Sequence, residues 1–497
     1  MLLPLLIIIP FISGLLCWQS ERLGAQFPRC MALIAIVIIL TLSLQILLGD
    51  YYKLTPFVFG LPQWYSEYSI TWIPVLGINF HLAIDGLSII MVILTEIMGI
   101  MAVLCSWSEI NQSPGVFHLN LLWILGGVIG VFIAIDLFLF FLFWEMMLVP
   151  MYFLISLWGH KGSLEDTRIN AALKFFIYTQ TSGLIMLITI LSLVLIHYSN
   201  TGILTFSYQQ LLQTSMSPTT EYLLMLGFFI ALSVKFPIVP LHGWLLDAHS
   251  QSPTAGSVEL AGIVLKTAAY GLLRFAIPLF PNASMKFAPI AMWLGIINIF
   301  YGALMAFSQI DMKRFIAYTS ISHMGFILIA IYTGNQLAYH GAVIQMIAQG
   351  ISAAGLFILC GQLYERLQTR HMCQIEGLWA TINYMPAFAL FFALATMGMP
   401  GTGNFIGEFM ILLGSYHIAP IITILASLSI VFTTVYSLIM IQRIYFGTTK
   451  PIHRLKGMTF REKFSMLLLI LLLILLCLVP QPVLDIISST TLINILQ

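Results

Sequence analysis

Four charged side chains lie inside long apolar stretches of this sequence, where water cannot hydrate them. They are Glu145 in FLFWEMMLVP, Lys235 in ALSVKFPIVP, Lys266 in ELAGIVLKTAAYG and Glu408 in GTGNFIGEFMILL. One unpaired charge at the bilayer centre costs at least about 2.5–3.5 kcal/mol, so four would cost on the order of 10 kcal/mol. Carboxyl and amino groups in such settings can take up and release protons. We therefore expect them to form a hydrated proton path.

Two prolines follow Lys235 and open the backbone beside it. Pro237 and Pro240 have no N–H group, so they free carbonyls that only water or polar side chains can satisfy at this depth. His242, seven residues after Lys235, would share its face if the helix resumed there, and it could pass a proton onward. Two loop groups follow that could continue this relay or be solvated surface residues: Asp247 and His249.

Each buried group also has a purely structural interpretation. Glu145 and Lys235 could form an ion pair that only stabilises the fold, and Lys266 could be a deprotonated core lysine. Glu408 could be a protonated acid bonded to opened backbone, and His323 in YTSISHMGF could be an ordinary core histidine. A proton path explains their joint occurrence on separate apolar stretches better than four unrelated accidents.

The elements that position these groups are membrane helices. The chain is 60% hydrophobic and 8% charged, with a mean hydropathy of +0.99, whereas a soluble domain has roughly a quarter charged residues. Apolar stretches of about 20 residues recur and predict an all-α integral membrane protein with about fourteen transmembrane helices, the first one retained rather than cleaved as a signal peptide. Strands are not expected, because these stretches lack alternation and are too long for barrel strands. A net charge of +1 argues against nucleic acid as a partner. The six scattered cysteines do not suggest metal ligands.

An internal similarity suggests how these helices are organised. KFPIVPLHGW in the seventh stretch and GMPGTGNFIGEF in the twelfth both interrupt a helix with Pro and Gly near the middle of the membrane. Because they lie five helices apart, we expect two inverted five-helix repeats with broken helices 7 and 12. The predicted divisions are N-terminal helices 1–3 over 1–110, repeats over 111–282 and 283–446, and the last helix over 447–497.

The placement of Lys and Arg predicts the orientation. With the N-terminus outside, fifteen cationic residues lie in cytoplasmic loops. Three remain on the external side, namely Lys53, Lys286 and Arg274 at a helix end. This bias predicts a bacterial inner-membrane protein with both termini in the periplasm.

Four segments of the sequence carry a family resemblance. FWEMMLVPMYFLI, VKFPIVPLHGWLLDAHSQSPTAGS, DMKRFIAYTSISHMGF and GMPGTGNFIGEF resemble the antiporter-like membrane subunits of respiratory complex I, and the similarity runs through essentially the whole chain. The resemblance implies fourteen transmembrane helices, two inverted repeats and a proton channel within a larger complex. It also implies that Glu145 is the ion-pair glutamate, Lys235 the broken-helix lysine, Lys266 the central lysine and Glu408 the exit-side glutamate.

Two positions depart from the family's pattern. Leu246 stands where the family usually has proline, and this change removes no titratable group. Gln349, in MIAQGISAAG, stands where the family usually has histidine. Because an amide carries no proton at neutral pH, we expect Gln349 to order a water that bridges His323 and Glu408.

The function implied is that of a proton-translocating membrane subunit of an NADH–quinone oxidoreductase. The chain has no glycine-rich βαβ turn and no cysteine quartet, so we expect no cofactor in it, and NADH, flavin, iron–sulfur clusters and quinone belong to the larger complex. Its expected partners are other membrane subunits, lipid, protons and internal water. A subunit of a multi-subunit sodium/proton antiporter and a membrane subunit of a hydrogenase-type complex are the alternatives.

Overall fold

Helices make up nearly all of the fold. The computed structural model describes residues 2–50, 63–160, 167–447 and 455–488. Its α-helices and π-helical segments are α1 (Leu2–Ser20), α2 (Gln26–Asp50), α3 (Gly86–Glu109), α4 (Pro114–Ile133), α5 (Leu137–Met146), α6 (Leu148–Trp158), α7 (Thr167–Thr201), α8 (Tyr208–Leu211), α9 (Pro218–Lys235), α10 (Gly243–Gln251), α11 (Thr254–Glu259), η3 (Leu260–Val264), α12 (Leu265–Gly271), η4 (Leu272–Ala276), α13 (Ile277–Leu279), α14 (Pro281–Phe307), α15 (Met312–Thr333), α16 (Gln336–Leu367), α17 (Met385–Thr396), α18 (Gly403–Tyr416), α19 (Pro420–Tyr445), α20 (Phe460–Leu478) and α21 (Gln481–Ser488). Short 3-10 turns occupy Glu21–Leu23, Pro74–Leu76, Met372–Gln374 and Leu378–Ala380.

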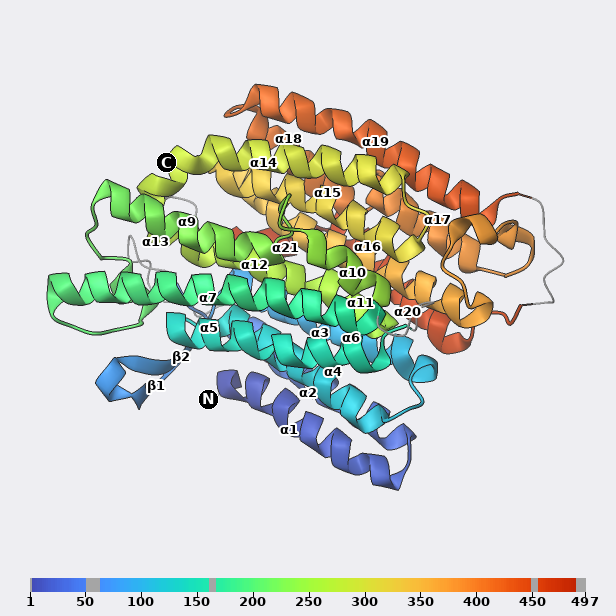
Figure 1. Cartoon of the computed structure of the whole chain (residues 1–497), viewed down its shortest axis with the longest axis horizontal. Helices are drawn as coiled ribbons and strands as arrows, with labels where there is room; N and C mark the ends of the chain where they lie inside the picture. Colours follow the sequence, from blue (N-terminus) through green and yellow to red (C-terminus); the bar gives the residue numbers. More distant parts are fainter. Residues whose placement is uncertain (1, 51–62, 161–166, 448–454, 489–497) are drawn as a thin grey trace.

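The long helices lie side by side in one bundle (Figure 1). Within the described residues, eleven helical stretches are long and apolar enough to cross a membrane, and the bent pair α20–α21 makes a twelfth. The two interrupted helices, α9–α10 and α17–α18, stand where broken helices 7 and 12 are expected. This arrangement confirms the all-α membrane fold and is compatible with fourteen spans.

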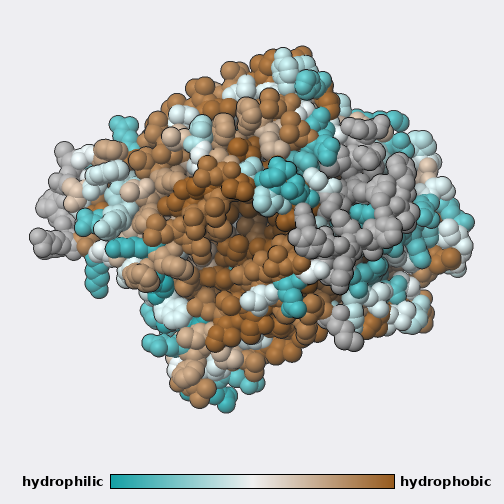
Figure 2. Space-filling view, turned by 180° about the vertical axis from the view of Figure 1, so that it is seen from behind, coloured by the Kyte–Doolittle hydropathy of each residue, from teal (hydrophilic) through white to brown (hydrophobic). Residues whose placement is uncertain are grey.

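The bundle has a buried centre and a lipid-compatible outer layer. The most apolar windows of Thr254–Leu279, α15 and α16 are completely buried, whereas those of α1, α2 and α19 are less than half buried. Seen from behind, apolar side chains cover the middle of the molecule, and polar ones gather toward its two ends (Figure 2). Of the proposed proton-path residues, Lys266, His323 and Gln349 lie on the three wholly buried stretches, where water reaches only internal spaces.

A β-hairpin contradicts the expectation that the chain has no strands. β1 (Ser66–Ile73) pairs antiparallel with β2 (Ile78–Ile84), and Gly77 turns between them with a left-handed φ of 66°. The segment SEYSITWI is rich in β-branched and aromatic residues, which favour strands. The hairpin was not predicted because it lies between two apolar stretches of membrane length, and only such stretches were counted as elements.

The two expected repeats share a detailed local structure. Asp136 caps the start of α5 with its carboxylate, and Asp311 caps the start of α15 in the same way. Each aspartate also forms a backbone bridge to a later loop, Asp136 to Ser207 and Asp311 to His371. Asp136 accepts a bond from the N–H of Asn79 in β2, whereas Asp311 pairs with a loop arginine at the other end of the bundle. Matching caps at opposite ends are what inverted repeats would produce.

The cationic loops lie together at one end of the bundle. Polar contacts join loops and helix ends that are far apart in the sequence: Arg29 to the Ile110 carbonyl, Arg461 to Ser108, Arg366 to Glu462, Arg370 to Asp311, and both Lys174 and Arg314 to Asp247. Four of the cationic residues counted from the sequence lie outside the described residues: Lys53, Lys161, Lys450 and Arg454. The described cations therefore support one strongly basic end.

Arg274, counted from the sequence as a cation at an external helix end, is buried within the protein. Its side chain is fully buried and forms an ion pair with Asp85, the residue that caps α3. Its guanidinium lies over Trp64, 5.2 Å from the ring centroid, and its Nε donates to the Tyr270 hydroxyl. Its burial comes from Trp64, just before the hairpin, and from Asp85 at the start of α3.

Candidate proton path

The break after α9 follows from the missing N–H of proline. In a continuous helix the Ser233 carbonyl would accept a bond from residue 237, but Pro237 cannot donate. The N–H of Ile238 bonds to Ser233 instead, at 3.0 Å, which leaves the Val234 carbonyl free. The Trp244 indole N–H donates to that carbonyl at 2.8 Å. The opened backbone beside Lys235 is thus satisfied by side chains within the protein.

Asn298 of α14 secures the other side of the break. Its Oδ1 accepts from the Val239 N–H at 2.7 Å, and its Nδ2 donates to the Pro237 carbonyl at 3.4 Å. The side chain is fully buried, so its polar atoms require such partners. Asn298 was not predicted from the sequence, although a lone asparagine in the apolar run LGIINIFYG is a signal that could have identified it.

Lys235 is buried, and its amine lies against the backbone and ring of Trp144. Its Nζ donates to the Trp144 carbonyl at 3.0 Å and lies 3.8 Å from the centroid of the Trp144 ring. Among the described residues, no N–O contact within 4.0 Å joins Lys235 to Glu145, and the expected pairing of the two groups stays a prediction. Glu145 lies instead against α7, where a Cβ on Gly183 would be 1.7 Å from its Oε1. The two groups nevertheless lie close enough to interact electrostatically.

Lys266 lies where the helix is widened by a π-helical segment. Its Nζ bonds to the Ala261 carbonyl and to Oε1 of Gln349 on α16. The π-helical segment η3 precedes it, and such segments often mark functional positions. The two backbones approach closely here, because a Cβ on Gly350 would lie 2.8 Å from the Gly262 carbonyl. This close crossing brings Gln349 onto the lysine.

Glu408 is held by two side chains from neighbouring helices. Its Oε1 contacts Nδ1 of His323 at 2.9 Å and accepts from Nε2 of Gln345 at 3.0 Å. Gly398, at the break before α18, leaves room for the other oxygen, because a Cβ there would lie 2.9 Å from Oε2. The direct contact shows that the expected water bridge between His323 and Glu408 is wrong.

Two glutamines on one face of α16 connect the lysine site to the glutamate site. Gln349 contacts Lys266, and Gln345 contacts Glu408. Residues four apart share a helix face and are about 6 Å apart along the axis. Two of their polar atoms are buried without a hydrogen-bond partner among the described residues, Nε2 of Gln349 and Oε1 of Gln345. One is a donor and the other an acceptor, so a water between them would satisfy both. Gln345 was missed from the sequence.

His242 does not share a helix face with Lys235. The chain becomes helical again only at Gly243, so the spacing argument for a continuous helix does not apply. The His242 ring instead packs edge-on against Tyr301, with ring centroids 4.9 Å apart, and its Nδ1 has no partner among the described residues. The structure leaves His242 near the break without a contact to Lys235.

The two loop groups of the expected relay have opposite environments. His249 is fully buried in α10, stacks on Phe357 with 4.6 Å between ring centroids, and has two ring nitrogens without partners among the described residues. Its interpretation as a solvated surface residue is therefore wrong. Asp247 is partly exposed and pairs with Lys174 at 2.6 Å and Arg314 at 2.7 Å, so it belongs to the basic end of the bundle.

Comparison with known proteins identifies the family. A profile described as "NADH:quinone oxidoreductase/Mrp antiporter, TM" matches residues 134–433. A relative in Escherichia coli (strain K12), named NADH-quinone oxidoreductase subunit M, is 66% identical over 100% of this chain and 98% of its own length. The chain belongs to the NADH:quinone oxidoreductase/Mrp antiporter family. A relative of the same name in Pseudomonas aeruginosa is 59% identical over 99% of this chain and 96% of its own length.

Two solved structures contain chains with the same architecture. Respiratory complex I from Thermus thermophilus contains a chain that matches with a TM-score of 0.87 and 26% identity, covering 100% of both chains. A chain of the Mrp complex from Dietzia sp. matches with a TM-score of 0.86 and 18% identity, covering 100% of this chain and 97% of that one, and this likeness concerns the fold alone. The family membership places this chain among multi-pass membrane proteins of the antiporter-like type.

Proposed function

We propose that this chain is the M-type membrane subunit of an NADH–quinone oxidoreductase and that it carries protons across the membrane. The observation that carries the proposal is the buried polar line from Lys266 through Gln349 and Gln345 to Glu408 and His323. These groups lie at the centre of an otherwise apolar bundle, where polar residues are costly and mark ion pathways. Full-length relatives of high identity carry the same name.

In the proposed path, Lys266 gives its proton to a water between the two glutamines, and that water passes a proton to Glu408. The amides carry no proton themselves, and they orient the water with the free Nε2 of Gln349 and the free Oε1 of Gln345. Glu408 then shares the proton with His323, which is a second titratable group in contact with it. The path therefore needs no histidine at position 349.

Lys235 and Glu145 form the second proton-binding unit of the proposal. Opposite charges about 4 Å apart interact by about 4 kcal/mol at an effective dielectric of 20, enough to hold a proton on the lysine. With Lys235 bonded to the Trp144 carbonyl and Glu145 against α7, that attraction is weakened. We infer that movement of Glu145 toward or away from Lys235 controls when the lysine releases its proton. His242 lies near the same break and is a further candidate carrier.

The redox chemistry is proposed to lie in other chains of the complex. NADH, flavin, iron–sulfur clusters and quinone would act there, and this chain would receive conformational or electrostatic work from neighbouring membrane subunits. The sodium/proton antiporter alternative is supported by fold likeness at 18% identity. The subunit M relatives, at 66% and 59% identity over the whole chain, favour the oxidoreductase.

Purification of the native complex through a tag on this chain tests the proposed function. We expect the purified complex to show the absorbance of flavin and iron–sulfur clusters and to oxidise NADH with quinone. A complex purified under the same mild detergent conditions that lacks both chromophores and NADH oxidation would contradict the oxidoreductase and favour the antiporter.

We propose that the basic end of the bundle faces the cytoplasm and that both termini face the periplasm. Cys373, an exposed cysteine in the loop after α16, provides the test. A membrane-impermeant thiol reagent should label it in inside-out vesicles and not in spheroplasts, and Cys373→Ser should remove that label. Labelling of Cys373 in spheroplasts would reverse the orientation.

We also propose that residues 111–282 and 283–446 are the two inverted repeats, flanked by 1–110 and 447–497. The matching caps and bridges of Asp136 and Asp311 support this division. Each lies at the start of the second helix of its repeat. The repeats would place one broken helix on each side of the Lys266 crossing.

A further inference from the structure

Glu259 is a buried carboxyl group that the proposed path does not use. It is the last residue of α11, is completely buried, and neither of its oxygens has a hydrogen-bond partner among the described residues. An ionised carboxylate in such a place would be uncompensated, so the group is stable only as a neutral acid that holds a proton. A structural role would be expected to give it partners, as Glu462 has in Arg366 and Thr459.

Glu259 lies between the Lys266 crossing and the basic end of the bundle. Three residues after it, Gly262 touches both Met98 of α3 and Gly350 of α16, where Gly350 is also next to the Lys266 side chain. The helix α11, which ends at Glu259, packs against α3, and Cys105 is two helical turns along α3 from Met98. The carboxyl group is therefore on the side of the crossing that faces Cys105.

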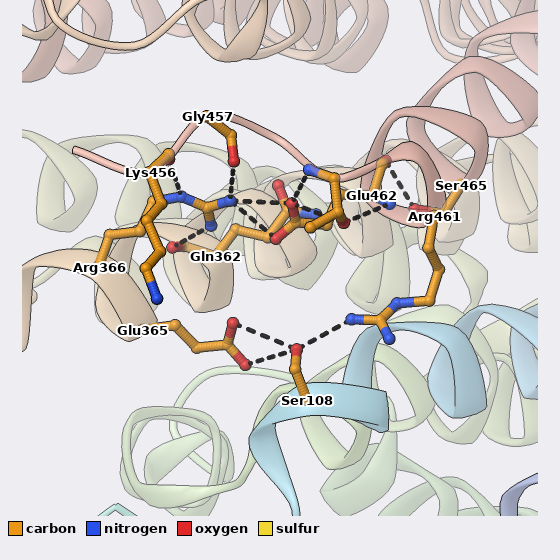
Figure 3. Close-up of polar contacts among 10 residues, drawn as sticks. Ser108, Gln362, Glu365, Arg366, Lys456, Gly457, Arg461, Glu462 and Ser465 are labelled. Atoms are coloured by element: carbon orange, nitrogen blue, oxygen red, sulfur yellow. Dashed lines mark hydrogen bonds and ion pairs between the residues drawn. The ribbon is translucent and has the colours of Figure 1, made fainter. Parts of the chain in front are cut away.

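A polar cavity leads from Cys105 toward the end of the bundle. It has a volume of about 10 Å³, room for roughly one water. Ser108, Thr254, Gln362, Glu365 and Arg461 contribute polar groups to its lining. The Ser108 hydroxyl stands between Glu365, 3.2 Å away, and Arg461, 2.9 Å away, as Figure 3 shows.

A larger cleft continues outward from the same residues. It has a volume of about 520 Å³ and shares Ser108 and Glu365 with the inner cavity, while Glu109 and His160 line its other walls. Polar groups thus line the cleft and, past the Ser108–Glu365 contact, the inner cavity at Cys105 and Thr254, which is five residues before Glu259 in the chain. The charged and titratable groups along it are Glu109, His160, Tyr364, Glu365, Cys105, Arg461 and Glu462 from the cleft and cavity, with Lys313 close to Glu109.

We propose that Glu259 takes up protons from the cytoplasmic end through this cavity and supplies them to Lys266. The inference rests on the proposed proton-carrying function and on the proposed orientation, and it adds the uptake route to that path. The neutral acid of Glu259 gives its proton through water to the uncharged amine of Lys266. The Glu259 carboxylate then takes a proton from the water in the cavity, and that water regains a proton from the cleft. Each transfer therefore leaves Glu259 as a neutral acid again.

Glu259→Gln is the primary test, in the assembled complex in inside-out vesicles, where the external solution bathes the cytoplasmic end. Glutamine preserves the shape of the side chain and cannot release a proton. We expect NADH-driven proton pumping to fall about tenfold, and to depend more steeply on external pH than in the wild type, because Lys266 must then be loaded directly from scarce protons in water. Glu259→Asp should retain most of the pumping.

The matched control is Glu96→Gln, a buried glutamate of α3 that bonds to Ser43 and lies outside the route. It should pump at the wild-type rate with the wild-type pH profile. Cys105→Leu, which fills the cavity with an apolar side chain and leaves Glu259 unchanged, is the second variant and should slow pumping as Glu259→Gln does.

Three results decide whether protons enter through Glu259, once assembly of each variant is verified by NADH oxidation with a hydrophilic acceptor. Slow, pH-steep pumping in Glu259→Gln and Cys105→Leu, with Glu96→Gln normal, supports the route. Normal pumping in both route variants, in a complex whose pumping Lys235→Ala abolishes, overturns the route and leaves the proposed function intact. Normal pumping in all of these variants overturns both.

Discussion

Replacing Lys235 with alanine is expected to lower quinone-coupled proton pumping by at least about tenfold in an assembled complex. The amine is buried, bonds to the Trp144 carbonyl and lies on the Trp144 ring, and alanine removes the titratable group without adding a charge. NADH oxidation with a hydrophilic electron acceptor should persist, because that chemistry is proposed to lie in other chains.

The matched control for Lys235 is Lys286→Ala, which removes a cation from an exposed position of α14. It should pump at the wild-type rate. A Lys235→Ala complex that pumps normally would show that the lysine beside the break is a structural residue and that the mechanism proposed for it and Glu145 is incorrect.

Glu408→Gln is expected to reduce pumping to a similar extent. Glutamine can still contact His323 and Gln345, the two side chains that hold Glu408, so the local packing should survive. It cannot accept a proton from the water near the glutamines, and the path should end there. Pumping is measured by quenching of a pH-sensitive dye in vesicles, and assembly by NADH oxidation with a hydrophilic acceptor.

Glu408→Asp separates charge from geometry. The shorter carboxyl group remains titratable but lies farther from His323, so we expect intermediate pumping. If Glu408→Gln and Glu408→Asp were equally impaired, the position would depend on shape rather than on proton binding, and its assignment to the path would fail.

Much of this path could be predicted from the sequence because charge in an apolar helix is costly. That argument identified Lys235, Lys266 and Glu408, and the prolines after Lys235 predicted the broken helix. His323 was recognised through its neighbours in the sequence, and the structure places it directly on Glu408. Their roles in proton transfer stay predictions.

The missing parts depend on contacts that no local pattern encodes. Gln345 is a neutral amide, so its burial carries no comparable warning, and its contact with Glu408 arises from the packing of α16 against α18. Gln349 was assigned to the wrong partner, because its contact with Lys266 depends on the close crossing at Gly350. The burial of Arg274 was missed for the same reason: its contacts with Asp85 and Trp64 come from segments far away in the sequence.

The number of protons pumped for each NADH oxidised tests the central claim most directly, namely that this chain itself carries protons. It should be measured in vesicles containing the wild-type, Lys235→Ala and Glu408→Gln complexes, at matched rates of NADH oxidation. The account predicts that both variants pump fewer protons per NADH than the wild type. An unchanged ratio in both variants would contradict it, because protons would then cross the membrane without using these groups.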